Sequence, residues 1–234
     1  MLTENQKERY LRQIALEELG EQGQLRLSNS SALIVGVGGL GSPIATLLTS
    51  AGFGRIGIID YDVVSLSNLP RQTLYTTEDI GLPKVECAVR RLSKMNNNIK
   101  IDSYNCRFDD ALAEKLLENY DIIIDGCDNM ETRYIIDRAA KKFNKPYIYG
   151  AISGFLGQVS VFHHKEAGSY SDLFPEDMAK PASKPPAVMA TTPAIIGAIQ
   201  ANEAFKIAIG YGETLSGRLL TFDNRDYSLN ILDI

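Results

Sequence analysis

Short apolar runs and longer amphipathic segments alternate along the sequence from about residue 31 to residue 150. The runs at 32–35, 55–60 and 121–126 have the length of strands that are buried on both faces of a sheet. Each is followed, directly or after a polar loop, by a segment with the apolar spacing of a helix. This alternation predicts a doubly wound α/β fold with a mostly parallel sheet.

The N-terminal residues do not belong to this alternation. Residues 3–20 are predicted to form one helix, because Thr3 and Gln6 have the spacing of a capping box and Gly20 is suited to end it. We therefore expect helices to precede the first strand.

Beyond residue 150 the pattern changes again. It predicts a strand at 157–164, a strongly apolar helix at 192–210 and two strands joined by a turn near Asp223. These strands would extend the sheet in antiparallel fashion. The intervening residues 165–190 contain four prolines and no regular period. Because long irregular segments in compact domains are often functional, we expect a role for this one.

A glycine-rich motif separates the first predicted strand from its helix. Residues 36–41, GVGGLG, place Gly36, Gly38 and Gly41 in a G-x-G-x-x-G pattern. Such a turn lets backbone N–H groups approach an anion at a helix N-terminus. Asp60 ends the next strand, where an acid can bind ribose hydroxyls. Together these residues indicate a Rossmann-like nucleotide site for NAD, FAD or ATP, rather than only a tight turn.

Polar residues cluster directly after Asp60. Asp62, Ser67, Asn68 and Arg71 follow it, and they could equally be a turn cap and a solvated loop. The planar guanidinium of Arg71, however, suits phosphate oxygens. The clustering therefore favours a phosphate site.

Lys84 opens the helix at 82–96, with Pro83 in its first turn. A lysine at this end opposes the helix dipole unless an anion lies nearby. Lys84 is therefore a candidate phosphate ligand, and an ordinary surface lysine is the alternative.

A second polar turn follows the predicted strand at 121–126. Either Asp128 or Asn129 is expected to cap the next helix. Because ligands bind at the carboxyl ends of parallel strands, an acid here could instead hold Mg²⁺ on the phosphates. Cys127 is expected to be a small buried apolar group rather than a nucleophile.

Composition limits the partners. The chain of 234 residues carries 24 Lys and Arg against 29 Asp and Glu, a net charge of −5, which disfavours nucleic acid. The N-terminus is polar, and no run reaches the roughly 18 apolar residues of a membrane span. We expect a cytoplasmic protein with no membrane partner.

Zinc ligands are scarce in this sequence. Cys87, Cys106 and Cys127 are widely spaced and are expected to be free thiols. His163 and His164 are the only histidines, and as neighbours on a predicted strand they point to opposite faces. No zinc site is therefore expected.

Several of these segments together resemble a known family. The stretches RYLRQIAL, GVGGLGSP, IIDYDVVSLSNLPRQ, GLPKVECA and DGCDNMETR are similar, in order and spacing, to the motifs of the ThiF/MoeB/HesA family. These proteins are bacterial relatives of ubiquitin-activating enzymes. The match runs through roughly residues 9–162, and AIIGAIQANEAFK resembles the late helix of the family.

The resemblance implies an activity. Such proteins bind Mg-ATP and adenylate the C-terminal glycine of a small ubiquitin-like sulfur carrier that ends in Gly-Gly. By matching position, Gly39 belongs to the phosphate loop, Asp60 binds the ribose, and Asp128 holds Mg²⁺. Asn68, Arg71 and Lys84 contact phosphates. Arg12, which from the pattern alone lies on a solvated helix face, would reach across a homodimer interface into the partner's ATP site.

The resemblance also implies a division of the chain. We expect a single adenylating domain with an N-terminal helical arm (1–30), a nucleotide-binding core (31–150) and a carrier-binding and dimerisation part (151–234). The segment 165–190 would clamp the carrier's tail.

The sequence departs from the family at its zinc site and in this loop. Ser169 and Asp172 stand where relatives carry zinc-binding cysteines, and the loop holds no cysteine for a covalent link to the carrier. Adenylation remains the expected reaction.

Three alternatives remain open at this point. An NAD-dependent oxidoreductase explains the glycines and Asp60 but not Arg71, Lys84 and Asp128. A family member that activates a carboxylate on a small molecule or a tRNA is the second. The third is a carrier-binding module without enzymatic activity. Thiamine, molybdopterin and cysteine or siderophore pathways all fit the sequence.

Overall fold

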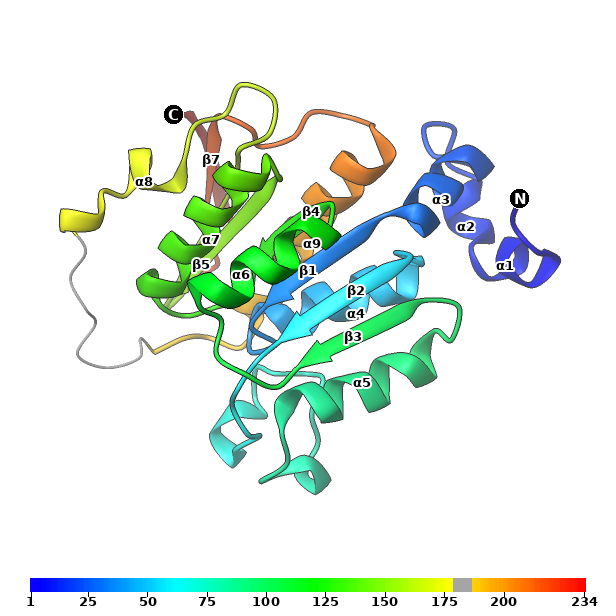
Figure 1. Cartoon of the computed structure of the whole chain (residues 1–234), viewed down its shortest axis with the longest axis horizontal. Helices are drawn as coiled ribbons and strands as arrows, with labels where there is room; N and C mark the ends of the chain where they lie inside the picture. The colour runs from blue at the N-terminus through cyan, green and yellow to red at the C-terminus, as the bar shows by residue number, and fades with distance from the viewer. Residues whose placement is uncertain (179–186) are drawn as a thin grey trace.

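The protein's structure, a computed structural model, describes residues 1–178 and 187–234 and contains one sheet of eight strands (Figure 1). The strand order is β3-β2-β1-β4-β5-β6-β7-β8. Neighbours are parallel from β3 to β5 and antiparallel from β5 to β8. The strands are β1 (Ser31–Val35), β2 (Arg55–Ile59), β3 (Lys100–Tyr104), β4 (Ile122–Asp125), β5 (Tyr147–Ser153), β6 (Leu156–Phe162), β7 (Arg218–Asp223) and β8 (Ser228–Asp233).

Helices cover both faces of this sheet, which confirms the predicted doubly wound fold and its antiparallel extension. One apolar core includes Ile34, Ile58 and side chains of α4 (Gly41–Ala51), α5 (Lys84–Met95) and α9 (Thr191–Ile209). The other includes Leu33, Ile59 and side chains of α6 (Asp110–Leu116), η3 (Leu117–Asn119) and α7 (Met130–Phe143). Successive strand residues alternate between the two cores, so the parallel strands are apolar on both faces.

The N-terminal region contains three helices instead of the single one predicted. These are α1 (Glu4–Arg9), α2 (Leu11–Ile14) and α3 (Gly20–Asn29), and the capping box of Thr3 and Gln6 is present. The prediction that Gly20 ends a helix is wrong, because Gly20 begins α3. The sequence did not predict α3, because the segment is polar and contains Gly23, a residue that disfavours helices. A Cβ at Gly23 would lie 3.0 Å from Leu19 Cγ and 3.1 Å from Ile209 Cγ2, so close packing requires a small residue there.

Part of the segment 165–190 is regular, although no period was found there. It contains α8 (Tyr170–Leu173) and η4 (Glu176–Met178), while 179–186 lie outside the described residues. The backbone N–H groups of Tyr170 and Ser171 donate to the carboxylate of Asp137 at 2.8 and 3.2 Å. Tyr170 is buried among aromatic rings of α7, β5 and β6. These tertiary contacts support α8 together with a local capping box, in which the N–H of Ser169 donates to Asp172 Oδ2 at 2.8 Å.

The prediction that the two histidines lie in a strand is wrong. Strand β6 ends at Phe162, and His163 has a positive φ of 53°, so neither histidine lies in the strand. His163 Nε2 lies 2.7 Å from Asp137 Oδ1, and this contact joins the end of β6 to α7. In the part of the chain that the structure describes, every helix is too short or too polar to cross a lipid bilayer.

Candidate nucleotide site

The glycine loop connects β1 to α4 at the carboxyl edge of the sheet. Gly36 has φ of +92°, and a Cβ there would lie 2.6 Å from the carbonyl oxygen of Gly126. A Cβ on Gly41 would lie 2.0 Å from the carbonyl oxygen of Gly36. Backbone packing alone therefore requires glycine at both positions.

Gly38 and Gly39 are different, because the fold does not require them. A Cβ on Gly38 would meet Gln72 Nε2 at 3.4 Å, and one on Gly39 would meet Pro193 Cβ at 3.4 Å, which are ordinary contacts. Both residues are only half-buried. Glycine here leaves the backbone open to close approach by a ligand, as a phosphate loop needs.

Asp60 fixes the glycine loop to the end of β2. Its Oδ2 accepts from the N–H of Val37 and its Oδ1 from the N–H of Asp62, both at 2.9 Å. Burial raises the pKa of the Asp60 carboxyl. Each carboxylate oxygen retains a lone pair, so the group can still accept from sugar hydroxyls.

Lys84 and Asp62 form an ion pair beside this carboxylate. The Lys84 Nζ lies 2.8 Å from Asp62 Oδ2, and the lysine side chain is 6% exposed against 52% for the aspartate. Since the lysine opens α5, its charge opposes the helix dipole. The anion expected near Lys84 is therefore present in the protein itself, as the carboxylate of Asp62.

Arg71 reaches the glycine loop from the polar segment after β2, which contains η1 (Leu66–Asn68) and η2 (Thr77–Asp79). Its Nη1 donates to the carbonyl of Ser67 at 2.8 Å, and its Cδ lies 3.9 Å from the Cβ position of Gly39. Its other N–H groups have no acceptor within residues 1–178 and 187–234. The side-chain oxygen of Asn68 already has a partner within the protein, because Oδ1 accepts from the N–H of Ser65 at 3.1 Å.

In the turn after β4, Asn129 and Asp128 have different roles, one as a helix cap and the other as a candidate metal ligand. Asn129 caps α7, with its Oδ1 accepting from the N–H of Thr132 at 2.9 Å. Asp128 is exposed, and its one side-chain contact among the described residues is with Asn129 Nδ2 at 3.4 Å. The turn packs on the glycine loop, because a Cβ on Gly126 would lie 2.2 Å from Gly36 O.

Asp128 suits a magnesium ion better than a metal held by protein alone. Across residues 1–178 and 187–234, no group of three or more His, Cys, Asp or Glu is arranged to hold a metal ion. Magnesium typically takes one or two protein carboxylates and completes its shell with phosphate oxygens and water. The absence of zinc stays a prediction.

Arg12 is the one predicted site residue that the chain keeps apart from the others. It lies exposed on α2, and the N-terminal helices attach to the C-terminal ends of α4 and α5. Gln13 Nε2 donates to Ala51 O at 3.1 Å, and Asn96 Nδ2 donates to Tyr10 Oη at 2.9 Å. These helices lie at the amino end of β1 (blue in Figure 1), away from the glycine loop.

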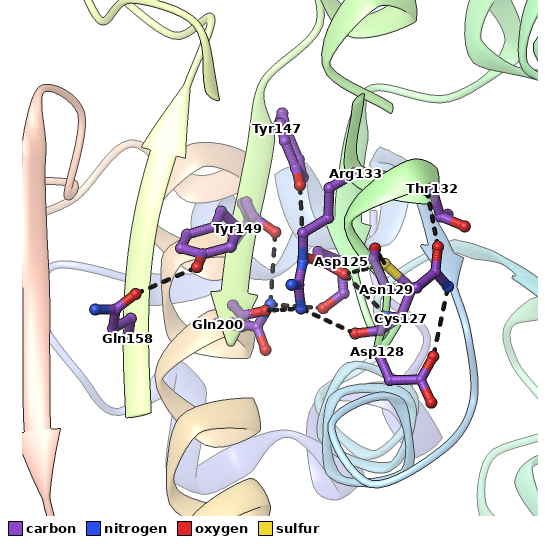
Figure 2. A network of polar contacts seen from close by, with 12 residues as sticks. Asp125, Cys127, Asp128, Asn129, Thr132, Arg133, Tyr147, Tyr149, Gln158 and Gln200 are labelled. Atoms are coloured by element: carbon purple, nitrogen blue, oxygen red, sulfur yellow. Dashed lines mark hydrogen bonds and ion pairs between the residues drawn. The ribbon is translucent and has the colours of Figure 1, made fainter. Parts of the chain in front are cut away.

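Behind Asp128 lies a buried polar network that the sequence analysis missed (Figure 2). It joins Asp125, which is fully buried, to Arg133 of α7, with Arg133 Nε donating to Asp125 Oδ2 at 2.8 Å. Gln200 of α9 donates to the Asp125 carbonyl at 2.7 Å. One signal was available: Asp125 and Gln200 are polar residues inside otherwise apolar segments.

Cys127 belongs to this network, so its predicted role as a plain apolar group is wrong. Its Sγ lies 2.9 Å from Asp125 Oδ1, to which the thiol donates, and its N–H donates to the same oxygen. Burial raises the pKa of the Cys127 thiol well above its ordinary value. A thiol held protonated in this way is a poor nucleophile.

Three comparisons relate the chain to known proteins. A family model described as the ThiF family matches residues 10–234. A sulfur carrier protein adenylyltransferase from Thermus thermophilus is 40% identical over 99% of this chain and 89% of its own length. A probable molybdopterin-synthase adenylyltransferase from Porphyra purpurea is 42% identical over 92% of the chain, which spans 57% of that protein.

Solved structures share the fold. PaaA superposes with a TM-score of 0.85 at 26% identity, over 100% of this chain and 75% of its own. MccB from E. coli superposes with a TM-score of 0.86 at 23% identity, over 97% of this chain and 70% of its own. At that identity the likeness to MccB shows the fold alone.

Proposed function

Because the chain belongs to the ThiF family, we propose that it uses ATP to adenylate the C-terminal glycine of a small ubiquitin-like sulfur carrier ending in Gly-Gly. The chain is an adenylyltransferase of the ThiF/MoeB type. One observation supports the ATP site: Gly38, Gly39, Arg71 and Lys84 lie together at one edge of the sheet, with the exposed carboxylate of Asp128 on the neighbouring turn.

The reaction joins two anions. A carboxylate oxygen of the carrier attacks the α-phosphorus, a carboxyl–phosphate bond forms, and the bond from the α-phosphorus to the bridging oxygen breaks, so pyrophosphate leaves. The protein's part is alignment and positive charge placed where negative charge accumulates. No protein nucleophile is needed, in keeping with the protonated thiol of Cys127.

Each residue has a separate task in this proposal. Asp60 accepts from the ribose hydroxyls, and the backbone at Gly38 and Gly39 contacts phosphate oxygens. Arg71 offers the triphosphate N–H groups that have no acceptor in the described part of the chain. The ammonium of Lys84, which donates to Asp62, has further N–H groups for a phosphate oxygen. Magnesium bound at Asp128 would offset the charge of the phosphates.

Arg12 enters the proposal through a second copy of the chain. Within one chain it lies at the amino end of the strands, away from the glycine loop. We propose a homodimer in which each Arg12 completes the partner's site.

The alternatives are less well supported. An oxidoreductase has no use for Arg71, Lys84 and a free Asp128 together. The intact set argues equally against a carrier-binding module without activity. The named relatives favour a protein carrier over a small molecule or a tRNA. One relative is named for molybdopterin synthase, and the thiamine pathway stays an alternative. A cytoplasmic location and the clamp by residues 165–190, partly outside the described residues, stay predictions.

Exchange of labelled pyrophosphate into ATP tests this proposal. We expect exchange that requires Mg²⁺ and a Gly-Gly carrier with a free C-terminal carboxylate. A carrier ending in a carboxamide is the matched control and should support none. Binding of NADH without any exchange would contradict the proposal.

A further inference from the structure

Strands β4 and β5 separate at their carboxyl ends, next to the proposed metal ligand. Their register pairs Ile123 with Tyr147 and Ile124 with Ile148, and the pairing ends there. Two helical side chains occupy the gap from opposite faces of the sheet. Gln200 Nε2 donates to the carbonyl of Asp125 at 2.7 Å, and Arg133 Nη2 donates to the carbonyl of Gly150 at 3.2 Å.

Arg133 also holds the peptide that leads into Asp128. Its Nη2 donates to the carbonyl of Cys127 at 3.1 Å, while its Nε donates to Asp125 Oδ2 at 2.8 Å. The N–H of Cys127 in turn donates to Asp125 Oδ1 at 2.9 Å. Cys127 is therefore fixed at both its N–H and its carbonyl by one buried ion pair (Figure 2).

Asp128 has little to hold it by itself. Its carboxylate is exposed, and within residues 1–178 and 187–234 its one hydrogen bond is a long one, from Asn129 Nδ2 at 3.4 Å. Its direction is therefore set by the residues on either side: Cys127, tied by Arg133 and Asp125, and Asn129, tied to the start of α7.

Stability alone does not explain why Arg133 and Asp125 form a buried ion pair, because well-packed apolar residues often replace such pairs without loss of folding stability. The planar guanidinium instead offers donors in several fixed directions, which a lysine ammonium lacks. Arg133 uses them on three acceptors that belong to β4, to the turn and to β5.

We propose that Arg133 is a positioning residue that orients the Asp128 carboxylate toward the Mg²⁺ of the bound nucleotide. The inference rests on the proposed function, and it adds to the proposed site a residue of α7 that does not itself contact the nucleotide. It predicts that Arg133 acts only on the metal-dependent part of nucleotide binding.

Titration calorimetry with α,β-methylene ATP, with Mg²⁺ or with EDTA, separates the two parts of binding. Arg133→Lys keeps a cation beside Asp125 but loses the spread of donors. We expect its affinity in Mg²⁺ to fall about tenfold, while its affinity in EDTA equals that of the wild type. Arg138→Lys is the matched control, because Arg138 lies on the same helix but pairs with the exposed Asp110. It should change neither affinity.

A double variant tests whether Arg133 acts through Asp128. In an Asp128→Ala background, Arg133→Lys should have no further effect on affinity in Mg²⁺. If Arg133→Lys does not fold, the Asp125→Asn/Arg133→Gln variant removes both buried charges, and the same loss in Mg²⁺ is expected.

Two results overturn the inference alone: equal affinities of wild type and variant in Mg²⁺, or an additive loss in the Asp128→Ala background. Failure of the wild type to bind the nucleotide in Mg²⁺ overturns the proposed function as well.

Discussion

The nearly buried ammonium of Lys84 donates to the half-exposed carboxylate of Asp62 across 2.8 Å. The two partners therefore stand in different surroundings, and losing one is not equivalent to losing the other. The pair lies beside Asp60, so a substitution in it should change both the stability of the fold and the charge of the proposed phosphate site.

Substitutions at this pair should separate stability from activity. Asp62→Asn removes the carboxylate that pairs with a nearly buried ammonium and leaves the buried carboxylate of Asp60 nearby, so we expect the free energy of unfolding to fall by about 2–3 kcal/mol. Lys84→Met leaves the Asp62 carboxylate, which water can solvate, and removes a favourable charge from the buried Asp60, so the loss should be smaller, about 1 kcal/mol. The same variant should reduce pyrophosphate exchange by roughly a hundredfold or more. Denaturant unfolding and exchange assays measure both effects, and the reverse order of stabilities would contradict the prediction.

Alanine at two positions of the glycine loop should have opposite effects. Gly39→Ala adds a Cβ at an ordinary distance from Pro193, so we expect the melting temperature to change little. The same Cβ fills the space above the backbone, and ATP affinity should fall about tenfold, or ~1.4 kcal/mol.

Gly36→Ala is the comparison variant. Its φ of +92° and its contact with Gly126 should destabilise the fold, by about 1–3 kcal/mol from backbone strain alone. Calorimetry and thermal unfolding of both variants test the pair. A Gly39→Ala variant with wild-type ATP affinity would remove the argument for a phosphate loop.

The attachment of α8 should depend on pH through Asp137. Burial opposes ionisation of this residue, but hydrogen bonds from His163, Tyr170 and Ser171 leave the pKa of its carboxyl below the ordinary value. Such a group stabilises the fold above its unfolded pKa of about 3.9, and the contribution is lost as pH falls through the lower folded pKa.

Asp137→Asn should therefore lower the melting temperature near neutral pH, and the difference from wild type should shrink as the pH falls below about 4. Melting curves across the pH range give this difference. A gap that stays constant down to the acid limit would show that the charge of Asp137 does not hold α8.

Mixing two inactive variants should restore activity if Arg12 acts in the partner's site. Arg12→Ala keeps its own phosphate ligands, and Lys84→Met keeps its own Arg12. After subunit exchange, half of the dimers carry one complete site, so about a quarter of the wild-type activity should return. Activity in the Arg12→Ala homodimer alone would contradict a role for the residue.

Much of the fold was predictable because its signals are local. The apolar runs gave β1, β2 and β4 within about a residue of their observed ends, since strands buried on both faces are written as continuous apolar segments. The glycine motif was recognisable because the backbone of a single turn requires glycine at positions 36 and 41.

The missed features depend on residues that are distant in sequence. Helix α3 packs Gly23 against Ile209, and the first residues of α8 donate hydrogen bonds to Asp137. The network behind Asp128 joins Arg133 to Gln200 through the carboxyl end of β4. A window of neighbouring residues does not contain both partners of these contacts. The capping box of Ser169 and Asp172 in α8 is the exception, a local signal that the sequence analysis missed.

The candidate site shows the same division. Asn129 and Asp128 were interchangeable as helix caps in the sequence, and only the hydrogen bond from Thr132 assigns the cap to Asn129. The pairing of Lys84 with Asp62 was likewise not predicted, although both residues had been singled out.

Intact-mass measurement of the carrier after an acid quench tests the central claim most directly. With enzyme, Mg²⁺ and ATP, we predict an AMP adduct on a carrier whose C-terminal glycine is free, and no adduct on the same carrier ending in a carboxamide. The Lys84→Met enzyme should give little adduct on either. No adduct on any free Gly-Gly carrier, or an equal adduct on the carboxamide, would contradict the proposed function.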